Sequence, residues 1–151
     1  MSLDSVANFT IVEVSTGYDD TDVTIVLKTG DGAKLPDPAV AEYNLVWYDS
    51  TTYPNPAEDP NVEIVRVTAL STDTLTVTRN QESSGASTKN TGSKIYKMIL
   101  SITAKMITDI GTATDKAKNP DNPIKLVNIQ PCCSANSLYA VVLYTVISNS
   151  L

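Results

Sequence analysis

The sequence predicts a mainly β fold, an antiparallel β-sandwich or barrel-like domain with one short helix and a C-terminal β arm. Short segments rich in Val, Ile, Thr and Tyr alternate apolar and polar residues, as half-buried strands do. Clusters of Gly, Pro, Asn and Asp separate these segments and are typical of turns. With 151 residues, of which 42% are hydrophobic and 19% charged, the chain can bury a core without metals or disulfides.

The predicted strands follow one another at short intervals. They span residues 9–14, 23–29, 44–49, 62–70, 74–82, 94–100, 124–129 and 138–148. A loop with Pro54, Pro56 and Pro60 follows the third strand, and its backbone is expected to be extended and stiff. The segment from Leu138 to Ser148 is too short to span a bilayer as a helix, so it is interpreted as a buried strand.

The hairpin from Val62 to Glu82 contains both arginines of the chain. With a three-residue turn at residues 71–73, one strand face carries Val65, Val67, Ala69, Leu75, Val77 and Arg79. The other face carries Arg66, Thr68, Thr74, Thr76 and Thr78. We expect the first face to line the core and the second to meet water or a partner. Glu63 then lies diagonal to Arg79, where a charge pair is expected, and a two- or four-residue turn would abolish this pairing.

One helix is predicted in the stretch "SITAKMITDIG", with Ser101 as N-cap and Gly111 as the stop. Ile102, Met106 and Ile110 share one face, which indicates a short helix that plugs the end of the β core. The predicted organisation is a β docking domain at residues 1–111, a polar linker at 112–123 and a C-terminal β segment at 124–151. That last segment is either an oligomerisation arm or the final strands of the same sheet.

Composition and motifs argue against several functions. The net charge of −6 disfavours non-specific nucleic-acid binding, and the N-terminus has no signal-peptide pattern. The chain has no histidine and no G-x-S-x-G nucleophile context, so no enzyme is predicted. "TGDGAKLP" lacks the G-K-[ST] ending of a phosphate loop, and Asp19, Asp20 and Asp22 lack EF-hand spacing. Glu58 and Asp59 have no evident partner, and no cofactor or metal is expected.

The two cysteines, Cys132 and Cys133, are adjacent. A disulfide between neighbours is strained and closes no useful loop, and two ligands without histidine do not make a zinc site. They are interpreted as small half-buried residues in a turn after Pro131, with a reactive or intermolecular thiol as the alternative.

The order of these motifs resembles a small β domain of tailed-bacteriophage virion proteins, found near the N-termini of fibre-like and other tail-associated proteins. The similarity covers about two-thirds of the chain, from residue 9 to 110. Its most specific parts are Gly30 to Pro36, Glu63 to Thr68, Thr74 to Arg79 with Gln81 and Glu82, and Ile102 to Lys105. Similar domains place a glycine directly after the arginine or glutamate, whereas here it comes only at Gly85.

The resemblance implies a non-enzymatic role in particle architecture, with the protein made in the host cytoplasm and located in the virion. Fibre proteins continue much further after the helix, which favours an accessory protein, a capsid decoration protein or a head/tail adaptor. Alternatives are a tail-fibre or baseplate-anchoring domain, or a carbohydrate-binding module using Trp47, Tyr48 and Tyr53. Expected partners are capsid or tail subunits and further copies of the chain, a trimer being one arrangement, with no nucleic acid or membrane. Expected interface residues are Arg66, Thr68, Thr76, Leu138, Val142, Tyr144 and Val146.

Overall fold

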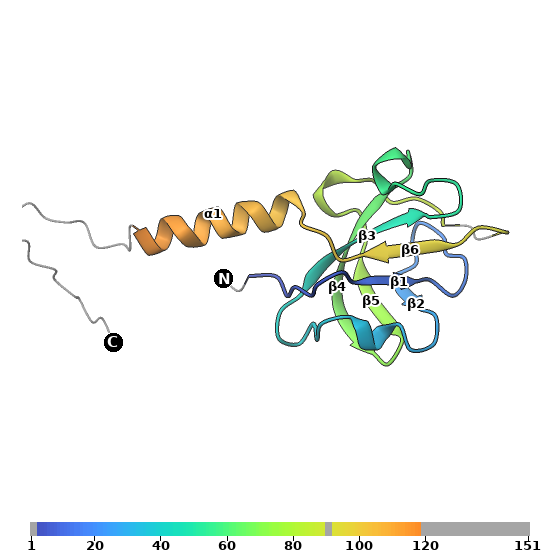
Figure 1. Cartoon of the computed structure of the whole chain (residues 1–151), viewed down its shortest axis with the longest axis horizontal. Coiled ribbons are helices and arrows are strands. Elements are labelled where there is room, and N and C mark those ends of the chain that lie inside the picture. Colours follow the sequence, from blue (N-terminus) through green and yellow to red (C-terminus); the bar gives the residue numbers. More distant parts are fainter. Residues whose placement is uncertain (1–2, 90–91, 119–151) are drawn as a thin grey trace, which may run out of the picture. The chain divides into compact units, whose positions relative to one another are not determined.

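The computed structural model describes residues 3–89 and 92–118 (Figure 1). This part of the chain forms a single six-stranded antiparallel sheet followed by one helix, so the mainly β, barrel-like fold class is confirmed. The strands and the helix are β1 Ile11–Glu13, β2 Thr24–Val26, β3 Tyr43–Asp49, β4 Glu63–Ser71, β5 Thr74–Thr78, β6 Tyr96–Ile99 and α1 Ala104–Lys118. Single turns of 3₁₀ helix lie at Gly32–Lys34, Pro56–Glu58 and Gln81–Ser83. The predicted strands at 124–129 and 138–148 lie outside the described residues.

The sheet is curled until its two edge strands meet. The strand order is β1-β6-β3-β4-β5-β2, with β1 and β2 at the ends of the row. Val14 and Leu27, just beyond these strands, pair with each other. The amide of Lys28 donates to the carbonyl of Glu13 at 2.8 Å, which joins the two edges directly. Backbone groups that an open sheet would leave unpaired are therefore used to close the barrel.

The core fills the inside of this curled sheet. In β3 the alternate residues Tyr43, Leu45 and Trp47 point inward and are fully buried, which follows from the two-residue period of a strand. The facing strands β4 and β5 contribute their own alternate side chains. The core residues are Val12, Val14, Ile25, Leu27, Leu35, Tyr43, Leu45, Trp47, Val65, Val67, Leu75, Val77, Tyr96 and Met98.

The turn of the β4–β5 hairpin has two residues, not the predicted three. Ser71 pairs with Thr74, which leaves only residues 72–73 to connect the strands. Thr72 has a φ of 53°, in the left-handed region that tight hairpin turns require. Without any other change, a two-residue turn would shift every residue pair of the hairpin by one residue relative to the prediction. The side chains predicted to face the core would then lie on the outer face.

A β-bulge in β4 restores the predicted register. The pairing shifts by one residue between Val67 and Ala69, so that Val67 still faces Val77 as predicted. On the turn side of the bulge, the faces are exchanged. Ala69 is exposed rather than buried, and Leu70 packs against the core in its place. The predicted faces are thus correct up to Val67 and wrong for Ala69.

The helix differs from the prediction at both ends. It begins at Ala104, so Ser101 is not its N-cap, and it continues through Gly111 to Lys118. The first seven residues of the predicted linker at 112–123 are therefore helical. The compact β unit ends at Ile110, next to the predicted boundary at residue 111. Glycine lowers helix propensity without forbidding a helix, which explains why Gly111 does not stop this one.

The predicted apolar face of the helix does not plug the barrel. Met106 is buried, with 8% of its surface exposed, but Ile102 is 73% and Ile110 is 47% exposed. Ile102 precedes α1, so the predicted grouping holds only for Met106 and Ile110, and spacing alone does not show which side of a helix a domain covers. Two of the three side chains are left on the surface. Among the described residues, no helix has the length and apolar character needed to cross a membrane.

Candidate functional site

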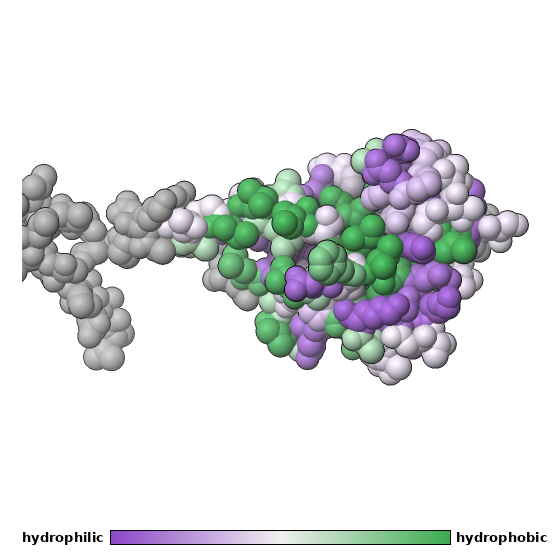
Figure 2. All heavy atoms as spheres, viewed as in Figure 1, coloured by the Kyte–Doolittle hydropathy of each residue, from purple (hydrophilic) through white to green (hydrophobic). Residues whose placement is uncertain are grey.

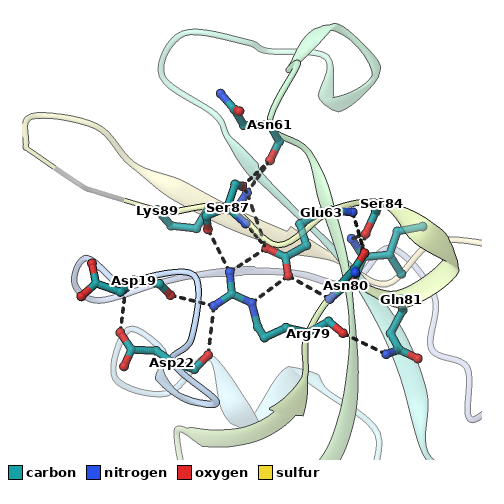
Figure 3. Close-up of polar contacts among 12 residues, drawn as sticks. Asp19, Asp22, Asn61, Glu63, Arg79, Asn80, Gln81, Ser84, Ser87 and Lys89 are labelled. Carbon is teal, nitrogen blue, oxygen red and sulfur yellow. Dashed lines mark hydrogen bonds and ion pairs between the residues drawn. The ribbon is translucent and has the colours of Figure 1, made fainter.

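The predicted pair of Glu63 and Arg79 is present at the centre of a buried polar cluster (Figure 3). Glu63 begins β4 and is fully buried, and Arg79 directly follows β5. The guanidinium Nε and Nη2 atoms each lie 2.7 Å from one carboxylate oxygen. This two-pronged geometry is the strongest form of carboxylate pairing. The β-bulge in β4 makes it possible, because without that bulge the two residues would not be diagonal neighbours.

The remaining polar atoms of the pair bind backbone groups from distant loops. The amides of Asn80 and Ser87 donate to the Glu63 carboxylate at 3.1 and 3.3 Å. Arg79 Nη1 donates to the carbonyls of Asp19 and Asp22 at 2.8 and 2.9 Å. The acidic turn therefore meets the arginine through its backbone, and its carboxylates are not the contact. A buried ion pair with satisfied donors and acceptors holds three loops in place.

Lys89 and Trp47 complete this buried cluster, and neither was predicted to belong to it. Lys89 is fully buried; its Nζ donates to the carbonyl of Asn61 and lies 3.8 Å from a Glu63 oxygen. The centroid of the Trp47 ring lies 5.0 Å from the Arg79 Cζ and 5.8 Å from the Lys89 Nζ, within cation–π range. Burial lowers the pKa of Lys89 to about 8. In the sequence, Lys89 stands in a polar loop and gives no sign of burial.

The buried cluster has a structural role. Glu63 and Lys89 have no exposed surface, so a substrate reaches neither group without opening the barrel. No group of His, Cys, Asp or Glu side chains in the described ranges is arranged to hold a metal ion. Trp47, considered for sugar stacking, is fully buried, and Tyr48 is 4% exposed. The geometry of these residues favours holding loops together over binding or chemistry.

Arg66, a predicted interface residue, is bound within the chain instead. Its guanidinium makes a two-pronged contact with Asp4, with distances of 3.0 and 2.9 Å. It also donates to Glu42 at 2.8 Å and to the side-chain oxygen of Asn44 at 3.0 Å. The arginine thereby fixes the N-terminal segment onto the outer face of the sheet. Most of its N–H donors are therefore used within the chain, and its role as an interface anchor stays a prediction.

The same outer-face network reaches the start of α1. Lys105 lies 3.2 Å from Asp4, and the Glu82 carboxylate accepts from the Lys105 amide at 3.1 Å and from Asn44 at 2.9 Å. Glu82 thus caps the helix N-terminus from more than twenty residues away, which is favourable for a negative charge. Burial acts to raise the pKa of Glu82, but hydrogen bonds from Thr103, Lys105 and Asn44 outweigh it and hold this pKa below its usual value.

The end of β3 carries another buried carboxylate. Asp49 accepts from the amides of Thr51 and Thr52 at 3.0 and 3.1 Å and lies 2.7 Å from Lys94 Nζ. Burial acts to raise its pKa, but the hydrogen bonds from Lys94 and Thr52 prevail and lower this pKa to about 2. Asp59, for which the sequence showed no partner, accepts from the Asp49 amide at 2.8 Å. Both acids therefore stiffen the proline-rich loop.

The glycine-rich loop "TGDGAKLP" is occupied by a side chain of the protein itself. The Asp73 carboxylate, from the β4–β5 turn, accepts from the amides of Gly30 and Gly32 at 2.9 and 2.8 Å. A Cβ on Gly32 would lie 1.8 Å from the carbonyl oxygen of Thr72, so this position requires glycine. A shallow hollow beside the loop is lined by these residues and by Leu35. The amides that a phosphate would need are already satisfied.

A group of exposed apolar side chains lies around the N-terminal segment and the start of the helix. We call it the apolar surface; its members are Leu3, Val6, Phe9, Ile102, Ile107 and Ile110, with exposed fractions of 48, 68, 103, 73, 58 and 47%. The Leu100 amide donates to the Thr10 carbonyl at 3.1 Å, so the backbone segments that carry Phe9 and Ile102 run side by side at this point. Figure 2 shows apolar side chains gathered over β6, β1 and the start of α1. Phe9 is held in the left-handed region, with a φ of 54°.

The other predicted interface residues divide into two groups. Thr68 and Thr76 are exposed on the outer face as expected, and the Thr68 hydroxyl donates to the Thr76 carbonyl at 3.2 Å. The other predicted interface residues lie outside the described residues; they are Leu138, Val142, Tyr144 and Val146. The two cysteines, Cys132 and Cys133, also lie outside the described residues. The sequence reasoning missed the apolar surface, although the apolar residues before the first strand were its visible signal.

Comparison with known protein families finds no match to this chain, and no curated protein sequence matches it.

Proposed function

We propose that this chain is a non-enzymatic structural protein of a bacteriophage virion, an accessory protein that docks on the particle. It serves as a capsid decoration protein or as a head/tail adaptor. The proposal combines the sequence resemblance described above with one observation of the fold. That observation is the apolar surface, where Phe9 is 103% and Ile102 is 73% exposed. Contiguous exposed apolar side chains mark contact sites between proteins.

The distribution of charges supports docking over catalysis. Glu63, Arg79 and Lys89 hold loops in the barrel, and Arg66 and Lys105 hold the N-terminal segment and the helix. These polar groups therefore stiffen the part of the chain that presents the apolar surface. A rigid surface loses little conformational entropy when it binds, which favours affinity for a partner. Tail-fibre or baseplate anchoring would use the same chemistry at another place in the particle.

Quantitative mass spectrometry of purified particles tests this role in a phage that encodes the chain. We expect the protein at a fixed ratio to one capsid or tail subunit, and the matching subunit distinguishes decoration from tail assembly. A chain abundant in the infected lysate and absent from washed particles contradicts the proposal.

A matched pair of variants tests whether the apolar surface makes this contact. Phe9→Asp with Ile102→Asp is expected to lower incorporation by at least about tenfold, because two apolar contacts are lost. The control, Val23→Asp with Ile95→Asp, changes side chains that are 49 and 47% exposed outside the apolar surface. Equal incorporation of both variants contradicts the assignment of the contact.

A further inference from the structure

The apolar surface is made from two pieces of chain that are far apart in the sequence. One half lies on the N-terminal segment, residues 3–9, and the other half lies on residues 102–110, before and within the start of α1. Both pieces belong to the compact β unit that ends at Ile110. A surface divided in this way stays intact only while the two pieces are held in place relative to each other.

The N-terminal segment is held by a buried charge rather than by its apolar side chains. Leu3, Val6 and Phe9 are 48, 68 and 103% exposed. Asp4 lies among them, yet only 1% of its side chain is exposed. Folded chains usually cover apolar side chains and expose charged ones, so this segment reverses the ordinary arrangement. The burial of apolar area therefore contributes little to its attachment, which points to the Asp4 carboxylate as the contact that holds it.

Asp4 joins the N-terminal segment to both β4 and α1. Its two carboxylate oxygens accept from Arg66 Nη1 and Nη2 at 3.0 and 2.9 Å. One of these oxygens also lies 3.2 Å from the Nζ atom of Lys105, the second residue of α1. Burial acts to raise the pKa of Asp4, but the hydrogen bonds from Arg66 and Lys105 outweigh it and hold this pKa below its usual value. One charged carboxylate thus connects three elements.

We propose that Asp4 is an ionic clasp, a positioning residue that holds the two halves of the apolar surface together as one docking site. When the clasp opens, the N-terminal segment and the start of α1 loosen together, because a single carboxylate serves both. This coupling is reciprocal, so a partner bound across both halves stabilises the closed clasp. The inference rests on the proposed function in taking the apolar surface as the docking site.

Nuclear magnetic resonance on the purified full-length chain tests the clasp. For residues 5–7 we expect backbone order parameters of about 0.85 in the parent and below about 0.6 in Asp4→Asn. The Ile107 amide, which donates to the Thr103 carbonyl at 3.3 Å, should exchange with solvent at least about fivefold faster in this variant. Glu42→Gln is the matched control, because Glu42 also binds Arg66, at 2.8 Å, but its removal leaves the contacts of Asp4 in place. The control is expected to keep both parent values.

A conservative variant separates the charge of the clasp from its shape. Asp4→Glu keeps the carboxylate, so both measurements should return most of the way to the parent values. If circular dichroism shows that Asp4→Asn does not fold, Lys105→Met breaks the same link from the helix side and is judged by the Ile107 exchange rate. Unchanged order parameters at residues 5–7 in Asp4→Asn overturn the proposal. Unchanged exchange at Ile107 also overturns it, because the two halves are then independent.

Incorporation into particles separates the clasp from the proposed role in the virion. Asp4→Asn is expected to enter particles at least about fivefold less than the parent, because the docking site is no longer preorganised. A loosened segment with full incorporation overturns the view that the clasp assembles the docking site. Absence of the parent chain from particles contradicts the proposed role instead, and the magnetic resonance measurements still decide whether the clasp exists.

Discussion

Replacing Arg79 by methionine tests whether the buried cluster holds the barrel together. The variant keeps an unbranched apolar stem but removes the guanidinium and both of its bonds to Glu63, whose carboxylate has no exposed surface. It also leaves the carbonyls of Asp19 and Asp22 without their donor. Breaking a buried ion pair by removing one partner costs about 3–5 kcal/mol. Domains of this size are stable by about 5–15 kcal/mol, so we expect a large fraction of the folding free energy to be lost.

Urea denaturation followed by tryptophan fluorescence measures this loss, because Trp47 packs against Arg79. Arg66→Met is the matched control: its guanidinium also pairs with a carboxylate, but 18% of the side chain is exposed. Asp4 keeps Lys105 at 3.2 Å in that variant, so we expect a loss of only about 1–2 kcal/mol.

A double-mutant cycle separates the ion pair from packing. Glu63→Gln with Arg79→Met removes the buried negative charge together with its partner. We expect the double variant to be at least about 2 kcal/mol more stable than the sum of the single losses predicts. A loss below about 1 kcal/mol for Arg79→Met, or additive losses in the cycle, would refute the view that this pair holds the barrel.

Three further outcomes are expected from the fold. Val67→Asp should unfold the domain because the new charge is buried without a partner, whereas Thr76→Asp should change the urea midpoint little; equal stability would contradict the register. Gly32→Ala should lower the free energy of unfolding by about 1–3 kcal/mol, because its Cβ would clash with the backbone. Gly111→Ala should raise the free energy of unfolding by up to about 1 kcal/mol, because Gly111 lies in a helix and no atom is near its added Cβ; thermal denaturation measures both changes. The Asp49 carboxylate is expected to contribute about 1–2 kcal/mol to the free energy of unfolding at a pH above its unfolded pKa of 3.8. This contribution is lost as the pH falls toward the folded pKa of about 2. When the free energy of unfolding is measured against pH, Asp49→Asn should abolish this part of the pH dependence.

The sequence by itself determined the elements and the main contents of the core. Alternation with a period of two identifies a strand from its own residues, which is why Val65 and Val67 were correctly assigned to the core. The proximity of Glu63 and Arg79 also followed from strand pairing, although the turn was assigned the wrong length. The bulge after Val67 adds one residue to β4, which has the same effect on the register as the third turn residue that was predicted. The alternation of apolar and polar residues is the same in both cases, so the sequence does not distinguish them.

Only the tertiary structure decided which polar side chains are partners and which apolar ones are exposed. Asp4 is 62 residues from Arg66 and 101 residues from Lys105, so no periodicity relates them. Lys89 is buried because Glu63 and Asn61 surround it, not because its neighbours in the sequence are apolar. Helical spacing grouped Ile102, Met106 and Ile110, but the packing of the domain buries only Met106 of the three. Local sequence sets the period of an element, whereas long-range packing sets its rotation and its partners.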